Sequence, residues 1–190
     1  MKRLFIGIPI NCGNAHLQVQ SWQSDPQFNL NRLAWTKEQN WHITLVFLGA
    51  MPESAVAPLS QIINSAFGNC PAYITSLTGL GVFPDKHKPK VLWIGLDNIQ
   101  PLLPGYQKLT SLLLENNIHF DSKPFKAHLT IARIKSLDTP EAFIAMLENN
   151  HITPLGEVSI DRVTLYESIS SPNGVMYQPL YEKNLKREQT

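Results

Sequence analysis

The sequence has few cysteines, no long apolar run and little charge, and each absence excludes a class of protein. Cys12 and Cys70 are its only cysteines. Two are too few for a disulfide framework, and no C-x-x-C pair indicates zinc or redox chemistry. No apolar stretch approaches the ~20 residues that a membrane-spanning helix needs. We therefore expect a protein of the cytoplasm, with reduced thiols and no contact with membranes.

The first twelve residues, MKRLFIGIPINC, have two cations followed by an apolar run, as a secretion signal does. However, the run is short, Pro9 interrupts it, and no small-residue cleavage site follows. We interpret this segment as the first β-strand of the fold.

The charge is nearly balanced, which limits the choice of partner. Sixteen Lys and Arg face fifteen Asp and Glu, and the formal net charge is +1. This balance argues against a strongly basic protein that coats nucleic acid, although a local basic groove stays compatible with it. The expected partner is a small molecule or the end of an RNA chain, and nothing indicates an obligate protein partner.

Predicted strands and helices intermingle without a regular β-α-β alternation, and no Gly-rich phosphate loop follows a strand. Expected strands are Arg3–Pro9, Leu33–Trp35, Trp41–Leu48, Tyr73–Val82, Val91–Leu96, Phe125–Ile134, Glu157–Ser168 and Val175–Lys183. Expected helices are Ala15–Gln23, a segment from about Glu53 to the stop at Gly68-Asn69, Pro101–Asn117, and Thr139 to about Glu148. This order predicts an α+β fold. At 190 residues it fits one domain, residues 1–190, built from two interleaved lobes.

Two of the predicted strands carry the same unusual motif. WHITLVFLG (residues 41–49) and FKAHLTIAR (residues 125–133) each place a histidine, one spacer and a threonine in an apolar strand. Residues i and i+2 of a strand share a face, so His42 lies beside Thr44, and His128 beside Thr130. Each strand thus presents a titratable ring and a hydroxyl on a rigid apolar support.

Chance accounts poorly for this repetition. With six His and ten Thr, about 0.3 His-x-Thr triplets are expected, and three occur. The third triplet, at His151, follows a helix stop and precedes Pro154, which disfavours a continuing strand. We expect His151 at the surface and interpret the other two triplets as a duplication that kept its chemistry.

Two histidines can supply one general base and one general acid in the same turnover. Two hydroxyls can bind the non-bridging oxygens of a phosphate between the rings, and hydrolysis of a cyclic phosphodiester uses such a set. Ring strain lowers its barrier enough to make a metal dispensable. Paired histidines also bind zinc, but neither H-x-H nor H-E-x-x-H is present, and no carboxylate adjoins either motif. We expect no metal and no cofactor.

At this point the sequence resembles the 2H phosphoesterase superfamily, which is defined by two H-x-[TS]-h motifs (h is apolar). More closely, it is similar to the LigT-like RNA 2′,3′-cyclic phosphodiesterases, also called the 2′–5′ RNA ligase family. The similarity covers RLFIGIP, WHITLVFLG, PKVLWIGL, FKAHLTIAR and LYESISSPNGVMYQPL, in that order.

The resemblance implies a pseudo-twofold α+β fold in which two mainly antiparallel sheets face a central cleft and helices lie outside. It also implies metal-independent hydrolysis of an RNA or nucleoside 2′,3′-cyclic phosphate to the 2′-phosphate. His42 would be the proton donor and His128 the proton acceptor, and Thr44 and Thr130 would bind the phosphate. The near-symmetric motifs do not themselves distinguish acid from base.

The resemblance further implies that Phe47 and Arg133, each five residues after a motif histidine, contact the nucleotide. Strict alternation places both on the face opposite the histidines, so this role requires a bulge or a strand end, and core packing is the alternative. Lys86, Lys88 and Lys90 form the one concentrated basic segment. It predicts either an RNA-backbone contact or a solvated loop.

Two other functions use the same residues. A module that binds RNA ends would recognise a terminal phosphate without turnover. The reverse reaction would join RNA halves through a 2′–5′ bond, and the sequence does not decide between hydrolysis and joining. No ATP-binding motif is visible, which disfavours ligation driven by a nucleotide.

Overall fold

Strands with either alternating or continuous apolar residues form the sheet of the computed structural model, which describes residues 1–25, 28, 32–121, 124–172 and 174–187. The strands are β1 (Lys2–Pro9), β2 (Arg32–Trp35), β3 (His42–Met51), β4 (Tyr73–Phe83), β5 (Val91–Leu96), β6 (His128–Ser136), β7 (Pro154–Ile160), β8 (Arg162–Ser171) and β9 (Gly174–Asn184). The helices are α1 (Gly13–Ser24), α3 (Val56–Phe67), α4 (Leu103–Glu115) and α5 (Pro140–Asn149), with short 3₁₀ turns η1 (Glu38–Asn40), η2 (Glu53–Ala55) and η3 (Gln100–Leu102).

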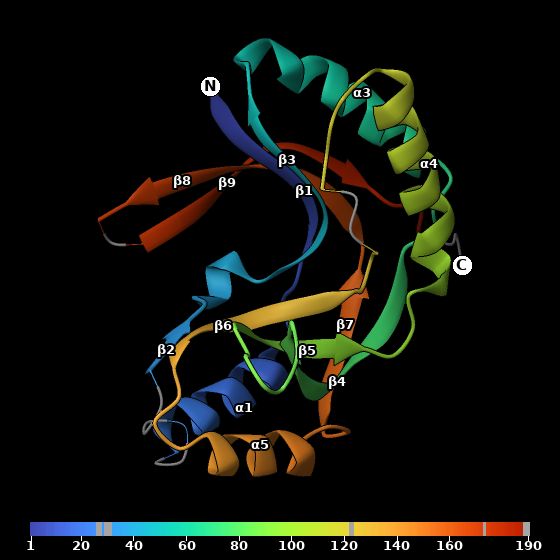
Figure 1. Ribbon diagram of the computed structural model, residues 1–190. Helices are drawn as coiled ribbons and strands as arrows, with labels where there is room; N and C mark the ends of the chain where they lie inside the picture. Colours follow the sequence, from blue (N-terminus) through green and yellow to red (C-terminus); the bar gives the residue numbers. More distant parts are fainter. Residues whose placement is uncertain (26–27, 29–31, 122–123, 173, 188–190) are drawn as a thin grey trace.

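Within the described chain, the strands form one curled antiparallel sheet in the order β7-β4-β5-β6-β3-β1-β8-β9, and β2 pairs with β6. Figure 1 shows two halves, with β1, β3, β8 and β9 above and the remaining strands below. The halves meet where β3 pairs with β6, and one residue pair, Ile43 with Leu129, forms that junction. The two motif strands are therefore neighbours at the centre of the sheet.

The α+β fold is confirmed, with one difference in the sheet. The resemblance implied two sheets, whereas the two halves are continuous through the Ile43–Leu129 pair. Away from this pair the strands of the two halves diverge, so each half curves as a sheet of its own. The description of residues 1–190 as two interleaved lobes stays a prediction.

The single strand expected over Glu157–Ser168 is wrong. The chain breaks at Asp161 into β7, which pairs with β4, and β8, which pairs with β1. The two strands thus belong to opposite halves of the sheet. Buried and exposed residues alternate towards the end of β7, whereas β8 has four consecutive buried residues, 163–166. The alternation therefore ends where the chain crosses between the halves.

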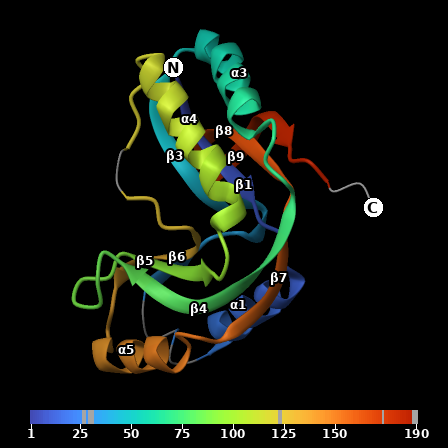
Figure 2. The same ribbon diagram turned by 90° about the vertical axis from the view of Figure 1, so that its right-hand side faces the viewer.

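The helices cover the outer side of each half. Helix α3 contacts α4, β8 and β9, while α1 contacts β7 and α5 contacts β4; Figures 1 and 2 show these two groups at opposite ends of the molecule. None of the described helices is long and apolar enough to cross a membrane.

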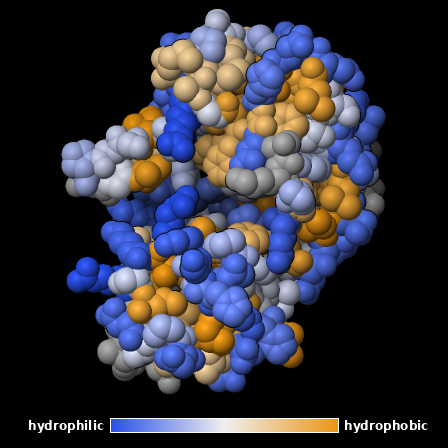
Figure 3. All heavy atoms as spheres, in the orientation of Figure 1, coloured by the Kyte–Doolittle hydropathy of each residue, from blue (hydrophilic) through white to orange (hydrophobic). Residues whose placement is uncertain are grey.

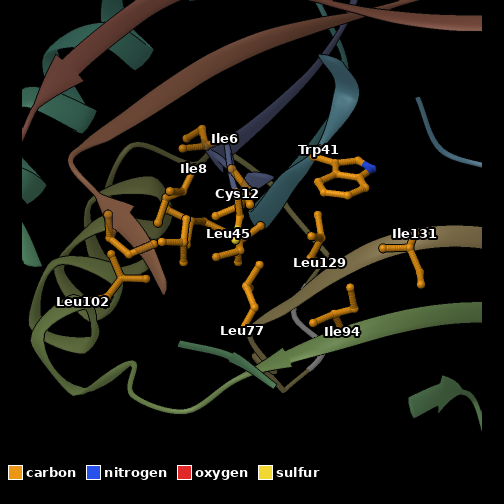
Figure 4. Packing of buried hydrophobic residues seen from close by; sticks show 14 of the residues in the cluster. Ile6, Ile8, Cys12, Trp41, Leu45, Leu77, Ile94, Leu102, Leu129 and Ile131 are labelled. Carbon is orange, nitrogen blue, oxygen red and sulfur yellow. The ribbon is translucent and has the colours of Figure 1, made fainter. Parts of the chain in front are cut away.

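The apolar core fixes the motif strands from behind. Ile43 and Leu129, the residues between each His and Thr, are fully buried, as is Ile131. Figure 4 shows Leu129 and Ile131 beside Ile94 and Trp41 in this core. Complete burial of one such side chain contributes roughly 1.5–3 kcal/mol. The opposite face of each motif strand is thereby held in place for the histidines and threonines.

Candidate active site

Both motif strands contain an extra residue just after the threonine, relative to a neighbouring strand, and β3 has a second one at Leu48. In β3, Val46 pairs with Ile6 and Thr44 pairs with Gly7, which leaves Leu45 without a partner on β1. In β6, Ala132 pairs with Leu92 and Thr130 pairs with Trp93, which leaves Ile131 without a partner on β5. Such bulges shift the alternation of side chains by one position.

These bulges decide the positions of Phe47 and Arg133. Both strands show the same succession of burial, in which the two residues after the threonine are both buried and the next one is exposed. Phe47 is 52% exposed and Arg133 is also exposed. The alternative of core packing for Phe47 is therefore wrong. Both side chains follow the bulge onto the face that carries the histidines.

Both histidines are anchored in the same way. Nδ1 of His42 lies 2.7 Å from the carbonyl oxygen of Asn40, and Nδ1 of His128 lies 2.6 Å from that of Lys126. A carbonyl oxygen only accepts, so each Nδ1 carries the proton and donates it. In the neutral ring, Nε2 then keeps its lone pair. Nε2 of His42 lies 3.0 Å from Oγ1 of Thr44, whose hydroxyl donates to it.

The sheet brings the two imidazoles together. The Ile43–Leu129 pair places His42 and His128 one residue to either side of the junction. In a regular antiparallel pair, such diagonal neighbours are about 7–8 Å apart. The charge of His128 is also one cause of the lowered pKa of His42. The two rings therefore act on each other electrostatically.

Each imidazole also packs against aromatic rings from strands that sequence reasoning did not connect with it. The His42 ring lies 4.8 Å from Phe5 and 4.9 Å, edge to face, from Tyr177. The His128 ring lies 4.8 Å, edge to face, from Phe83 and 6.3 Å from Trp93. Tyr177 lies in the sequence segment that carried the family resemblance, but spacing alone gives no signal for its contact with His42.

Burial lowers the pKa of both histidines. Desolvation lowers the pKa of His42 to about 4; the hydrogen bond to Asn40 opposes this effect, and the charge of His128 adds to it. Desolvation also lowers the pKa of His128, the bond to the Lys126 carbonyl opposes it, and the Lys126 ammonium lowers it further. Both rings are therefore neutral near pH 7 in the free protein.

A large open cavity of about 730 Å³ collects most of the predicted site residues. Thr44, Phe47, His128 and Arg133 line it, together with further cations and aromatic rings. These added lining residues include Lys90, Lys126, Phe83 and Phe125. Figure 3 shows the surface hollowed between the β8–β9 hairpin and the lower half. His42 adjoins this cavity through its bond to Thr44.

The lysines of the basic segment lie in different places, so neither alternative, an RNA contact or a solvated loop, applies to all of them. Lys90 lines the large cavity, as a contact with RNA requires. Lys86 instead forms an ion pair of 2.9 Å with Glu148 on α5, away from that lining. Asp85 accepts hydrogen bonds from the backbone N–H groups of His87 and Lys88, which orders the loop.

The remaining sequence candidates lie elsewhere. His151 is exposed between α5 and β7, as expected, and its Nδ1 contacts the carbonyl of Glu148. In the described part of the chain, no three His, Cys, Asp or Glu side chains come together as a metal centre would require. The site that the described residues build is thus one of two imidazoles, hydroxyls and cations.

A curled antiparallel sheet with one His-x-Thr strand in each half defines the 2H phosphoesterase class. Residues 14–93 and 96–177 match the family described as LigT like Phosphoesterase, and the chain belongs to this family.

Its relatives and structural neighbours agree with this assignment. The chain is 32% identical to the RNA 2′,3′-cyclic phosphodiesterase of Thermotoga maritima, over 78% of this chain and 77% of that protein. It is 29% identical to the protein of the same name from Methanocaldococcus jannaschii, over 95% and 99%. Crystal structures of a Thermus thermophilus protein and of E. coli LigT with 3′-AMP share the fold, with TM-scores of 0.76 and 0.72 and 22% identity. These matches cover 98% and 97% of this chain and 100% and 98% of the respective structures.

Proposed function

We propose that the chain hydrolyses the 2′,3′-cyclic phosphodiester of an RNA end or a nucleoside to the 2′-phosphomonoester. Two imidazoles on neighbouring strands, each with its Nδ1 proton held by a carbonyl, carry this proposal. The names of the family relatives support it.

The reaction needs one base, one acid and donors for the phosphate oxygens. Nε2 of His128 takes a proton from water as the water oxygen attacks phosphorus. The bond between phosphorus and the ribose 3′-oxygen breaks, and Nε2 of His42 gives a proton to that oxygen. The hydroxyls of Thr44 and Thr130 donate to the non-bridging oxygens, where negative charge develops. Strain in the five-membered ring assists the step, and we propose no cofactor.

Because the pKa of His42 is low, we propose that this ring becomes protonated when the substrate binds. A phosphodiester is an anion, and an anion close to the imidazole favours the protonated ring. Binding therefore raises the pKa of His42 from about 4 in the free protein and charges the acid where it is needed. Protonation and substrate binding are linked, so affinity increases as the pH falls towards 4.

Phe47 and Arg133 extend the site from the phosphate to the rest of an RNA chain. Both line the large cavity beside His128, together with the cations Lys90 and Lys126. An arginine binds phosphate through a planar fork of donors, and an exposed aromatic ring offers a stacking surface for a base. We assign Arg133 to the backbone of the RNA and Phe47 to a base upstream of the cyclic end.

The test is incubation of a short RNA with a 2′,3′-cyclic end in EDTA, with the product identified by mass and by chromatography beside synthetic 2′- and 3′-phosphate standards. A 2′-phosphate is the expected product. Binding of this RNA without any product would contradict the reaction and favour the RNA-end binding module. A 3′-phosphate product would contradict the assignment of the leaving oxygen.

A further inference from the structure

A second cavity lies on the other side of His42 from the large one. It measures about 320 Å³, is open to solvent, and is lined by residues from the end of β1, the turn η1, and strands β8 and β9. His42 lines the small cavity, Thr44 lines the large one, and these two side chains are hydrogen-bonded at 3.0 Å. The two cavities therefore meet at the His42–Thr44 pair, where the proposed reaction takes place.

The two cavities differ in charge. The large one contains Lys90, Lys126 and Arg133, which suit phosphate. Among the described residues that line the small one, none is a lysine or an arginine. Its polar groups include the carboxylate of Glu38 and the amides of Asn11 and Gln39, all on exposed residues, and its walls include the ring of Tyr177. Amides beside an aromatic wall suit an uncharged planar ligand that has hydrogen-bonding edges.

The walls of the small cavity are held in place. The side-chain amide of Asn40 on η1 donates to the carbonyl of Val175 on β9 at 2.7 Å, which ties the turn to the hairpin. The Tyr177 ring packs on His42 and Phe5, at 4.9 Å from each. Glu38, at the rim, contacts Nδ1 of His16 at 2.9 Å. A site built in this way can bind a rigid ligand with little reorganisation.

We propose that the small cavity is a nucleobase subsite, which takes the base of the nucleoside that carries the cyclic phosphate. This inference rests on the proposed function. In a displacement at phosphorus, the attacking and leaving oxygens lie roughly in line on opposite sides. The leaving 3′-oxygen faces His42, so the ribose of the terminal nucleoside lies on the His42 side, next to the small cavity. The volume lies at the lower end of the ~300–1,000 Å³ of small-molecule sites.

The proposal divides an RNA substrate between the two cavities. The terminal base enters the small cavity, which has no lysine or arginine among its described lining residues, and Asn11 and Gln39 can hydrogen-bond its edge there. The phosphates that precede it lie along the cations of the large cavity. The chemical class of substrate is thus an RNA end whose last base contributes to binding, rather than any small cyclic phosphate.

The experiment compares a substrate that has a base with one that lacks it. Adenosine, guanosine, cytidine and uridine 2′,3′-cyclic phosphates are each compared with methyl riboside 2′,3′-cyclic phosphate, in which a methyl group replaces the base. Asn11→Trp puts a large ring at the small cavity, and Gln39→Ala removes one hydrogen-bonding group. Gln61→Ala, which alters an exposed residue of α3, is the matched control.

We expect the wild type to prefer at least one nucleoside substrate over the methyl riboside by tenfold or more in kcat/KM. Asn11→Trp should remove most of that preference, because it should lower kcat/KM for the nucleoside substrate far more than for the methyl riboside. Gln39→Ala should lower kcat/KM for the preferred base three- to tenfold, mainly through KM. Unchanged base preference in both variants would overturn the proposal, as would a preference that disappears in Phe47→Ala instead.

If the wild type hydrolyses neither these substrates nor a short RNA with a 2′,3′-cyclic end, the proposed function fails and binding decides the subsite. Calorimetric titration with the four nucleoside 2′-monophosphates and with inorganic phosphate then replaces kinetics. Weaker binding of a nucleotide to Asn11→Trp, with phosphate binding unchanged, would support the subsite. Equal binding of the nucleotides to wild type and variant would overturn it.

Discussion

The two motif strands share a backbone and differ in their surroundings. In β3 and β6 the histidine, the threonine and the bulge occupy matching places, and each Nδ1 donates to the carbonyl two residues earlier. Around them, the side chains are different. His42 lies against Phe5 and Tyr177, while the ammonium of Lys126 lies near His128, 4.3 Å from the centre of the Trp93 ring.

This difference shows which parts of a duplicated site are alike and which are not. The position after the bulge is Phe47 in one strand and Arg133 in the other, so one half presents an apolar ring and the other a cation. The repeated backbone sets the geometry, and the neighbouring side chains set the electrostatics. The comparison therefore predicts which substitutions should have equal effects in both halves and which should not.

The largest expected effect is equal in the two halves. His42→Ala and His128→Ala should each lower kcat on a 2′,3′-cyclic-ended RNA by roughly 10²–10⁴-fold, because each removes one proton-transfer group. His151→Ala is the matched control, since it alters the third His-x-Thr triplet on the surface. Substantial turnover by either motif variant in a steady-state assay would refute the role given to that histidine.

The second expected effect concerns how the free energy of unfolding depends on pH. His42 has a pKa of about 4 when folded and an ordinary value near 6.5 when unfolded. Between these values the unfolded chain binds more protons, so the free energy of unfolding decreases as the pH falls from 6.5 to 4. At ~1.4 kcal/mol for each pKa unit, His42 contributes about 3 kcal/mol to this decrease.

Denaturant unfolding of wild type and His42→Asn at several pH values measures that contribution. The variant should lose less stability than the wild type over the same range. His128→Asn should act in the same direction, because burial also lowers the pKa of His128. Parallel curves for wild type and His42→Asn would contradict the buried neutral state of His42.

The third prediction concerns the two side chains that follow the bulges, Arg133 and Phe47. Arg133→Met should lower kcat/KM for an RNA about tenfold at low salt and weaken its salt dependence, because one phosphate contact is lost. Phe47→Ala should cost a similar factor through lost stacking, without changing the salt dependence. Kinetics at several KCl concentrations separate the two results. Identical salt slopes in both variants would show that Arg133 does not contact phosphate.

The smallest expected effect concerns Lys126. Its ammonium lowers the pKa of His128, so Lys126→Met should raise that pKa and move the acidic limb of the kcat profile to higher pH. The change in kcat at neutral pH should be only a few-fold. Lys126→Arg keeps the charge and should keep the profile. A pH profile that is unaltered in Lys126→Met would show that Lys126 does not act on His128.

The sequence predicts much of this arrangement because the signals are local. Alternation of apolar residues marks most strands, and the two His-x-Thr triplets stand out against chance. The bulges also leave a local sign, since Leu45-Val46 and Ile131-Ala132 are adjacent apolar pairs that interrupt the alternation. A prediction from strict alternation ignores these pairs and therefore places Phe47 in the core.

Other features depend on the order of the strands and have no local signal. Tyr177 contacts His42 from near the other end of the sequence, although β1 and β8 lie between their two strands, and the curl of the sheet brings the two rings together. The break at Asp161 is similar, since it reflects a change of pairing partner from β4 to β1. Patterns along the chain do not encode such partners.

The extra residue in each motif strand has a consequence for how sequences of this kind can diverge. Removal of Leu45 or Ile131 would eliminate the bulge after the threonine, turn the side chains that follow it over, and bury Phe47 or Arg133 while exposing an apolar neighbour. Substitutions along these strands can thus be tolerated where a gain or loss of a single residue cannot. Length variation should concentrate in the connections between strands, and the number of residues from each histidine to the end of its strand should stay constant.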